Sequence, residues 1–328
     1  MYKVNNPDLV KYTVATEWSE DNDGKMQVNQ YEVIKELGSG SYGVVYLVRD
    51  TKTGNYYAMK ELTKSKLRNK NRSTRSINPP TIYGKRDSGG PLIGGRYAGF
   101  MRRSSSFKKE QKDPFYLIKE ELAICKKLNH RNVTRLYEVL NDPEQDMLYM
   151  VIELCEAGPV MKVTLNGTNI MDESNARNYF IQSLLGLEYL HENGIAHRDI
   201  KPDNMLLTRD DVLKLSDFGE AYMFIGKGKD GDGGSDNDEI DDDDATMDSR
   251  STGMTLAGTE AFMAPELLEG NLNPNLMPSA DIWALGVSLY CFLYDKLPYE
   301  RCEGQLEIAD SIYHKRQVVP MTHGGRQV

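Results

Sequence analysis

Apolar and polar residues alternate over most of residues 31–50, on both sides of a glycine-rich stretch. Alternation with a period of two predicts β-strands with one buried face, and glycines between two such runs predict a turn. A third run of this kind covers residues 54–62, and a strongly apolar run covers residues 146–154. The front half of the chain is therefore predicted to form an antiparallel, strand-rich unit.

Helical spacing of apolar residues predicts three helices. Residues 113–130 begin with an Asp-Pro pair, which suits the N-cap and the first helical position. Residues 176–194 show the same spacing and end at Gly194, a residue typical of a helix C-terminus. Residues 281–294 form the most apolar stretch, which is too short to span a bilayer, and we expect a buried helix there. The predicted fold class is α+β, with a strand-rich front half and a helix-rich back half.

Charge is distributed unevenly along the 328 residues, whose net charge is −9. Residues 64–112 carry 14 lysines and arginines against two acidic residues, whereas residues 226–253 carry ten acidic residues against three basic ones. Both segments are rich in glycine or serine, and we expect each to be a solvated insertion. The four cysteines lack metal-ligand spacing and the N-terminus lacks the apolar run of a signal peptide, so we expect a cytoplasmic chain with reduced thiols and no membrane partner.

The glycine-rich stretch fits the pattern G-x-G-x-x-G-x-V with Gly38, Gly40, Gly43 and Val45. It joins two predicted strands instead of opening a helix, which argues against a dinucleotide-binding fold. Backbone N–H groups in such a flap can cover phosphates, and Lys60 on the third strand can then reach them.

Glu121 is an anomaly in the predicted helix 113–130, because it lies on the apolar face between Leu117 and Cys125. A carboxylate that faces a core needs a cationic partner, and Lys60 in its apolar strand offers one. The alternative is that Glu121 reaches the surface.

Residues 195–204 read IAHRDIKPDN, a density of charge that suits neither a helix nor a core. Transfer of a phosphoryl group needs positioning and charge neutralisation more than covalent chemistry. Asp199 can orient an attacking hydroxyl and accept its proton, and Lys201 can contact the transferred phosphate. Asn204 and Asp217 offer the hard oxygen ligands that Mg²⁺ prefers, so the candidate cofactors are ATP and Mg²⁺.

The order of these motifs resembles that of the protein kinases: glycine-rich loop, strand lysine, helix glutamate, HRD with a following Asn, DFG, APE at 264–266 and DIWALG at 281–286. The stretch GTEAFMAPE, together with Lys201 and Thr259, resembles the serine/threonine branch. The resemblance implies a two-lobed kinase fold, with an antiparallel β-rich N-lobe and a helical C-lobe, and a role for Arg198 in anchoring the activation segment.

Further stretches resemble the calcium/calmodulin-dependent protein kinase kinases over about residues 28–300: VNQYE at 28–32, residues 146–161, AFMAPE at 261–266 and the basic insertion. This resemblance implies an upstream kinase whose protein substrate is another kinase, phosphorylated on an activation-loop threonine. Related upstream kinases of the AMP-activated kinase remain an alternative. The insertion resembles the Arg-Pro-rich element that these kinases use to recognise substrate kinases.

The same resemblance implies an ATP pocket between the lobes. Ile152 is the expected gatekeeper, the backbone of Glu153 and Cys155 meets the adenine, and three apolar side chains sandwich the ring. The implied ATP-binding residues are Leu37, Gly38, Gly40, Gly43, Val45, Ala58, Lys60, Ile152, Glu153, Cys155 and Leu206.

The C-terminal part departs from the kinase pattern, because only 28 residues follow LPYE at 297–300. Kinase C-lobes carry several more helices there, including the arginine that pairs with the APE glutamate, Glu266. We therefore expect a truncated C-lobe and a fragment or short isoform. The expected organisation is an N-terminal extension at 1–30, an N-lobe at 31–155 with the basic insertion at 64–112, and an incomplete C-lobe at 156–328 with the acidic insertion at 226–253.

Two alternatives follow from that departure. The chain is either an active kinase, since every catalytic position is intact, or a non-catalytic module that binds ATP or a partner without turnover. No basic amphipathic segment for calmodulin follows the predicted kinase domain, so calmodulin is a family expectation without a visible site. Nucleic acid is not an expected partner, because the basic insertion has few aromatic residues for stacking.

Overall fold

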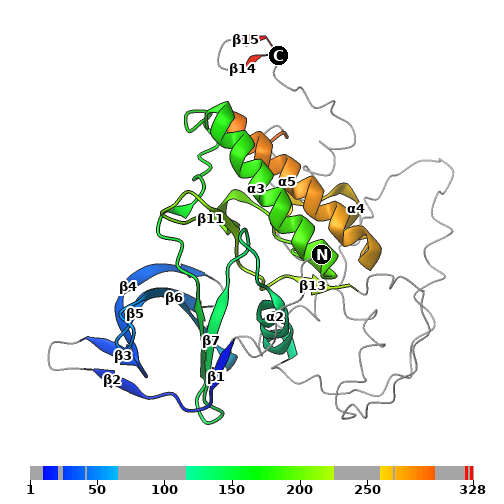
Figure 1. Ribbon diagram of the computed structural model, residues 1–328. Coiled ribbons are helices and arrows are strands. Elements are labelled where there is room, and N and C mark those ends of the chain that lie inside the picture. The colour runs from blue at the N-terminus through cyan, green and yellow to red at the C-terminus, as the bar shows by residue number, and fades with distance from the viewer. Residues whose placement is uncertain are drawn as a thin grey trace, which may run out of the picture.

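The computed structural model shows a strand-rich lobe beside a helical lobe (Figure 1). It describes residues 10–20, 25–40, 43–65, 116–224, 259–268 and 270–299, with two short strands near the C-terminus. For residues 116–120 only the backbone is described. Residues 66–112 of the expected basic insertion, and the whole expected acidic insertion at 226–253, lie outside these ranges.

The N-lobe is one eight-stranded sheet with the order β1-β7-β8-β6-β5-β4-β3-β2. Strands β4 to β6 form the predicted meander, and β8 lies within the predicted apolar run 146–154. Strands β1 to β3 lie in the segment expected to be an N-terminal extension and add to both edges of the sheet. The strands are β1 Lys11–Thr13, β2 Trp18–Glu20, β3 Met26–Val28, β4 Tyr31–Gly40, β5 Gly43–Asp50, β6 Tyr56–Thr63, β7 Leu136–Asn141 and β8 Met147–Ile152.

The sheet curls strongly (Figure 1), and buried residues of β3 to β8 form an apolar core of its own. Met59, Leu140, Tyr149 and Val151 are fully buried in this core. Helix α2, Tyr116–Lys127, is the predicted helix 113–130 and packs through its apolar face into a second, larger core that continues into the C-lobe. Helix α2, which carries Glu121, thus packs in a core that contains residues of both lobes.

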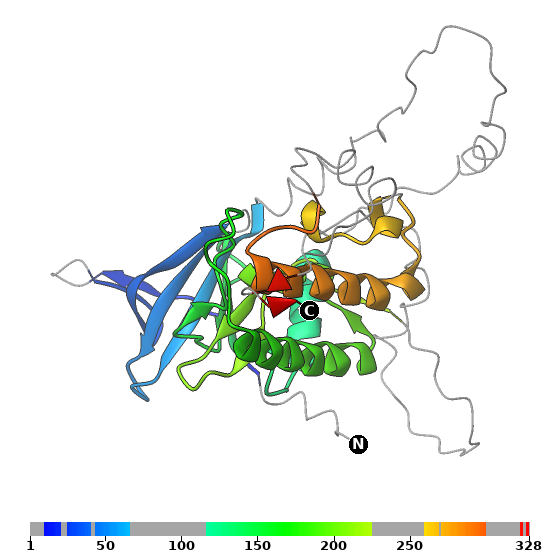
Figure 2. The same ribbon diagram turned by 90° about the horizontal axis from the view of Figure 1, so that it is seen from above.

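Two long helices dominate the C-lobe and lie side by side (Figure 2). Helix α3, Glu173–Glu192, begins three residues before the predicted start because Asp172 accepts a hydrogen bond from the Asn175 N–H and caps it. Gly194 follows the helix with φ of 70°, which confirms the predicted C-terminal glycine. The other elements are α4 Pro265–Leu268, α5 Met277–Tyr294, β9 Gly158–Pro159, β10 Ile195–Ala196, β11 Met205–Leu207, β12 Leu213–Leu215, β13 Tyr222–Met223, β14 Thr322–His323 and β15 Arg326–Gln327.

Helix α5 is the predicted buried helix, and Leu285, Cys291 and Phe292 on it are almost completely buried. The helix begins at Met277 and is therefore longer than the predicted stretch 281–294. Residues 274–294 reach a membrane-spanning length and apolarity by those two criteria alone, with half of the apolar window buried inside the structure. Buried core helices meet the same two criteria, so they do not distinguish a core helix from a membrane-spanning helix.

Candidate active site

The glycine-rich turn is the hairpin between β4 and β5, with Ser41 and Tyr42 outside the described residues. A Cβ added at Gly43 would lie 1.7 Å from the carbonyl oxygen of Glu61. The packing of β5 against β6 is therefore enough to require a glycine at this position. A Cβ at Gly38 would meet no atom within 4 Å, which leaves open space over that part of the hairpin. Gly38 therefore remains a candidate for phosphate contact, and Gly43 has a structural reason of its own.

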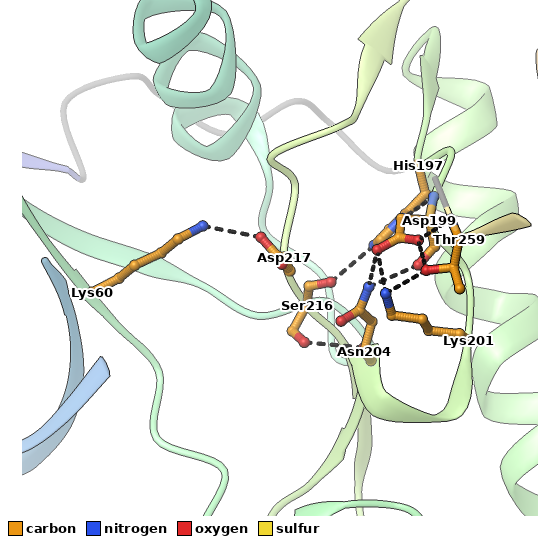
Figure 3. Close-up of polar contacts among 8 residues, drawn as sticks. All are labelled: Lys60, His197, Asp199, Lys201, Asn204, Ser216, Asp217 and Thr259. Carbon is orange, nitrogen blue, oxygen red and sulfur yellow. Dashed lines mark hydrogen bonds and ion pairs between the residues drawn. The ribbon is translucent and has the colours of Figure 1, made fainter. Parts of the chain in front are cut away.

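Lys60 connects the two lobes. Its Nζ lies 3.0 Å from Glu121 Oε1 on α2 and 3.0 Å from Asp217 Oδ1 in the C-lobe, the latter shown in Figure 3. Burial by itself would lower the pKa of Lys60, but the charges of Glu121 and Asp217 outweigh it, so the net pKa is raised and the ammonium stays charged. The predicted pairing of Glu121 with Lys60 is confirmed, and the surface alternative is excluded.

The loop after β10 is held by a buried carboxylate on α5. Asp281 is 1% exposed and accepts hydrogen bonds from the backbone N–H groups of His197 at 2.9 Å and Arg198 at 2.8 Å. Arg198 adopts a left-handed φ of 67°, a conformation that a non-glycine residue holds only where its surroundings fix it. These contacts set the direction in which the chain enters Asp199. The expected role of Arg198 as an anchor involves residues 225–258, which are not described.

The carboxylate of Asp199 is the centre of the site and accepts four hydrogen bonds (Figure 3). Oδ2 accepts from Lys201 Nζ at 2.8 Å and from Asn204 Nδ2 at 2.9 Å. Oδ1 accepts from the N–H and the hydroxyl of Thr259, at 3.0 and 2.9 Å. Burial alone would raise the pKa of Asp199, but the hydrogen bonds from Lys201 and Thr259 dominate and lower it. Asp199 is therefore a fixed, ionised carboxylate.

Thr259 lies in the site although the sequence did not predict a contact for it there. Its hydroxyl accepts a hydrogen bond from Lys201 Nζ at 2.6 Å while donating to Asp199. The signal was present in the stretch GTEAFMAPE, where Thr259 had been used only to distinguish the serine/threonine branch. Spacing could not reveal the contact, because Thr259 lies 60 residues after Asp199.

The hydrogen bonds that Asn204 and Asp217 already make show which of their oxygen atoms are left for a Mg²⁺ ion. The hydrogen bonds of Asn204 to Asp199 use only its amide nitrogen, which leaves its carbonyl oxygen for a ligand. Asp217 gives one oxygen to Lys60, and its side chain is 42% exposed. Burial alone would raise the pKa of Asp217, but the Lys60 ammonium lowers it, so the carboxylate is ionised. Two hard oxygen donors fit a Mg²⁺ ion that takes its other ligands from phosphates and water.

The expected adenine-binding residues lie where the two lobes meet. Ala58 pairs with Ile152 across β6 and β8, and Val45 pairs with Lys60 across β5 and β6. The Glu153 side chain forms an ion pair with Lys214 at 2.7 Å and its N–H donates to the carbonyl oxygen of Arg135 at 2.8 Å, so its own carbonyl oxygen is the backbone group left for a ligand. The contacts of the remaining residues, Leu37, Gly40, Cys155 and Leu206, with a nucleotide stay predictions.

Glu266 of the APE motif lies in α4. Within the described ranges up to residue 299, no ion pair to Glu266 is found. The arginine that the resemblance implies as its partner was expected in the missing part of the C-lobe, and the side chains of the arginines after residue 300 are not described.

Comparison with known proteins agrees with this geometry. The model of the protein kinase domain matches residues 100–324, a range that contains Glu121, Asp199 and Asp217. Lys60 and the glycine-rich turn precede that range, but the matches to whole relatives cover about nine-tenths of the chain.

The relatives are serine/threonine kinases. The chain is 35% identical over 297 residues to a calcium/calmodulin-dependent protein kinase kinase of Caenorhabditis elegans, covering 90% of this chain and 47% of the relative. It is 35% identical over 315 residues to the calcium/calmodulin-dependent protein kinase kinase cmkC of Emericella nidulans, covering 93% and 53%. A probable serine/threonine-protein kinase of Dictyostelium discoideum is 32% identical over 94% of this chain and 36% of its own length.

The chain thus spans between about a third and a half of the relatives that it matches. Its α+β architecture, its ordered motifs and the family match lead to one conclusion: the chain belongs to the protein kinase domain family, and among its relatives are serine/threonine-protein kinases.

Proposed function

We propose that the chain is an ATP- and Mg²⁺-dependent serine/threonine protein kinase that phosphorylates other kinases on activation-loop threonines. The observation that carries the proposal is the pair of contacts that Lys60 makes at once with Glu121 and Asp217, each at 3.0 Å. These contacts bring the strand lysine, the α2 glutamate and the DFG aspartate together in the arrangement that phosphoryl transfer in kinases requires.

Each side chain then has a task. Asp199 orients the substrate hydroxyl and accepts its proton, and its four hydrogen bonds hold it in place for that. Lys201 lies 2.8 Å from Asp199 and stabilises charge on the transferred phosphoryl group. Lys60 holds the α- and β-phosphates. Mg²⁺, held by Asn204 and Asp217, supplies neutralisation of phosphate charge when it is bound.

The substrate class rests on the relatives. Two of them are named calcium/calmodulin-dependent protein kinase kinases, a name that places another kinase as their substrate. The hydroxyl of Thr259 beside Lys201 and Asp199 supports the serine/threonine specificity. Calmodulin control stays a family expectation, since the resemblance alone suggests it.

The test is phosphate transfer from Mg²⁺-ATP by purified chain 1–328 to a kinase that bears its activation-loop threonine. Asp199→Ala should abolish transfer, and Asp210→Ala should not, because Asp210 is an exposed aspartate on the turn between β11 and β12. A soluble chain that binds an ATP analogue but transfers no phosphate would refute the proposal and identify the non-catalytic binding module instead. Phosphate on tyrosine alone would refute the serine/threonine assignment.

A further inference from the structure

The first strand of the described chain occupies the outer edge of β7. In β1, Lys11 to Thr13 pair in parallel with residues 138–140 of β7 (Figure 1). This pairing is fastened at Glu138, which is 3% exposed although it is a carboxylate. Lys11 Nζ at 2.6 Å and the Thr13 hydroxyl at 2.5 Å both donate to its Oε1. Because a buried carboxylate requires donors, β1 and β7 stabilise each other through Glu138.

The same short strand also contacts the helix that carries Glu121. The ammonium of Lys126, in the last turn of α2, lies 5.0 Å from the centroid of the Tyr12 ring. That distance is within the range of a cation–π contact. Val10, just before β1, packs against the large core to which α2 contributes Leu122 and Cys125. Residues 10–13, which we name the N-terminal strap, therefore join the edge of β7 to the C-terminal half of α2.

The position of α2 decides whether the Lys60 ion pair forms. Glu121 and Lys126 are five residues apart on one helix, so a shift of the last turn is transmitted to Glu121. We propose that the N-terminal strap is a positioning element for α2: its docking on β7 holds the Lys126 end of the helix so that Glu121 meets Lys60. The consequence for phosphate transfer rests on the proposed kinase function, whereas the positioning itself does not.

The strap has the features of an element that can open and close. Its strand has three residues, and Lys11 and Tyr12 are exposed, with Tyr12 at 46%. Short exposed segments of this kind open at a small fraction of the free energy of global unfolding. If strap docking favours the Lys60–Glu121 pair, a ligand that requires this pair must favour strap docking by the same factor. Nucleotide binding in the cleft would thus be coupled to the strap.

The experiment compares hydrogen exchange of backbone amides in chain 1–328 and three variants. Tyr12→Ala removes the ring, Lys126→Met removes the cation from the other side, and Tyr12→Phe keeps the ring. The matched control is Val14→Ala, because Val14 is 58% exposed and only two residues away. Amides 122–127 of α2 are measured with and without Mg²⁺ and a non-hydrolysable ATP analogue, and amides 179–187 of α3 serve as the internal reference.

Tyr12→Ala and Lys126→Met should each speed exchange at amides 122–127 by about two- to fivefold, the factor that an exposed cation–π contact supplies. Val14→Ala should match the wild type, and Tyr12→Phe should fall between the wild type and Tyr12→Ala, because it keeps the ring but loses the hydroxyl that accepts a hydrogen bond of 2.5 Å from Asn141 Nδ2 on β7. The analogue should slow exchange at amides 11–13 in the wild type and less so in Tyr12→Ala. In transfer assays Tyr12→Ala should lower kcat and leave the KM for the protein substrate unchanged.

Unchanged exchange at amides 122–127 in both Tyr12→Ala and Lys126→Met would overturn the proposal, because the strap would then stabilise only the edge of β7. Faster exchange across the α3 reference as well would also overturn it, since the variants would have lowered global stability. A chain that does not bind the analogue would count against the proposed kinase function, and the α2 exchange of the ligand-free variants would still decide the positioning role.

Discussion

Asp295 lies directly after α5 and ties the end of this helix to the loop at residues 164–169. It is fully buried and left-handed, with φ of 48°. Its carboxylate accepts from the N–H of Thr164 at 2.7 Å, of Asn169 at 3.1 Å and of Thr168 at 3.2 Å, and from the hydroxyl of Thr164. A left-handed aspartate is strained unless its contacts compensate, so we expect these donors to be the reason that the position tolerates aspartate.

The pKa of Asp295 gives the size of the stabilisation that these hydrogen bonds contribute to folding. Burial alone would raise the pKa of Asp295, but the hydrogen bonds from Thr164, Asn169 and Thr168 lower it from 3.8 to about 2. A shift of that size corresponds to at most about 2.5 kcal/mol. Although Asp295 itself is buried, its donors lie on a mostly exposed loop, so solvent screening reduces the expected contribution to about 1–2 kcal/mol. Asparagine tolerates the left-handed backbone, but in Asp295→Asn an amide N–H₂ faces N–H donors and cannot accept from them. The variant should therefore lose about 1–2 kcal/mol of folding free energy.

Urea unfolding of wild type and Asp295→Asn at pH 7 measures the loss, and the melting temperature should fall by about 2–8 °C. The matched control is Asp211→Asn, because Asp211 has a similar φ of 60° but, among the described residues, its carboxylate accepts a hydrogen bond from Tyr179 alone. A depressed pKa stabilises the fold fully above the unfolded value near 3.8, and the effect is lost as the pH falls through about 2. The gap between wild type and Asp295→Asn should therefore be constant from pH 5 to 8 and narrow below pH 4. Equal stability of the two proteins at pH 7 would refute the reasoning.

Four further predictions concern packing and catalysis. Gly186→Ala should destabilise the chain by about 1–3 kcal/mol in urea, because its Cβ would lie 2.8 Å from Asn132 O and 2.9 Å from Leu215 Cδ1; wild-type stability would show that α3 can shift. Thr259→Ala should lower kcat by about tenfold, because it removes the hydroxyl that holds Asp199 in position as the proposed base. Thr259→Ser keeps a hydroxyl and should keep kcat near the wild-type value, so equal kcat values for the two variants would contradict this role. Because the pKa of Asp199 is lowered, kcat should show no acid limb from this group between pH 5.5 and 8; an acid limb there that Thr259→Ala shifts to higher pH would contradict this, because losing the Thr259 hydroxyl raises the pKa of Asp199. Chelation of Mg²⁺ should abolish transfer without changing the melting temperature of the nucleotide-free chain.

The cluster of candidate catalytic residues could be predicted from the sequence because their proposed chemistry fixes residue types at short spacings. Asp199, Lys201 and Asn204 lie within six residues of one another, and the structure brings them together through hydrogen bonds of 2.8–2.9 Å. The ion pair of Lys60 with Glu121 spans 61 residues, yet it could be inferred because each residue is a charge in an apolar pattern. Local anomalies of this kind carry information about partners that are distant in the sequence.

Other features left no local signal. Asp281 lies inside the most apolar stretch of the chain, and the pattern could not show that its carboxylate would accept the N–H groups of His197 and Arg198. The true start of α5 at Met277 was missed because the four residues before Asp281 do not continue the apolar run. Strands of three residues, such as β1, are shorter than any window in which alternation can be recognised.

Side chains that take part in phosphoryl transfer are visible in the sequence, whereas contacts that position α2 are not, and the reason is physical. Phosphoryl transfer constrains side chains, so its residues are visible as motifs, whereas β1 pairs with β7 mainly through backbone groups that almost any sequence provides. The sequence signal of the pairing is Glu138, a charged residue in a mostly apolar strand whose donors come from residues 11–31. Glu138, like Glu121, is a carboxylate in an apolar pattern that requires donors. Its donors Lys11 and Thr13 belong to the N-terminal strap, the segment proposed to hold α2 in place. The N-terminal strap, rather than a further catalytic motif, is therefore the feature by which this kinase domain would set the geometry of its own site.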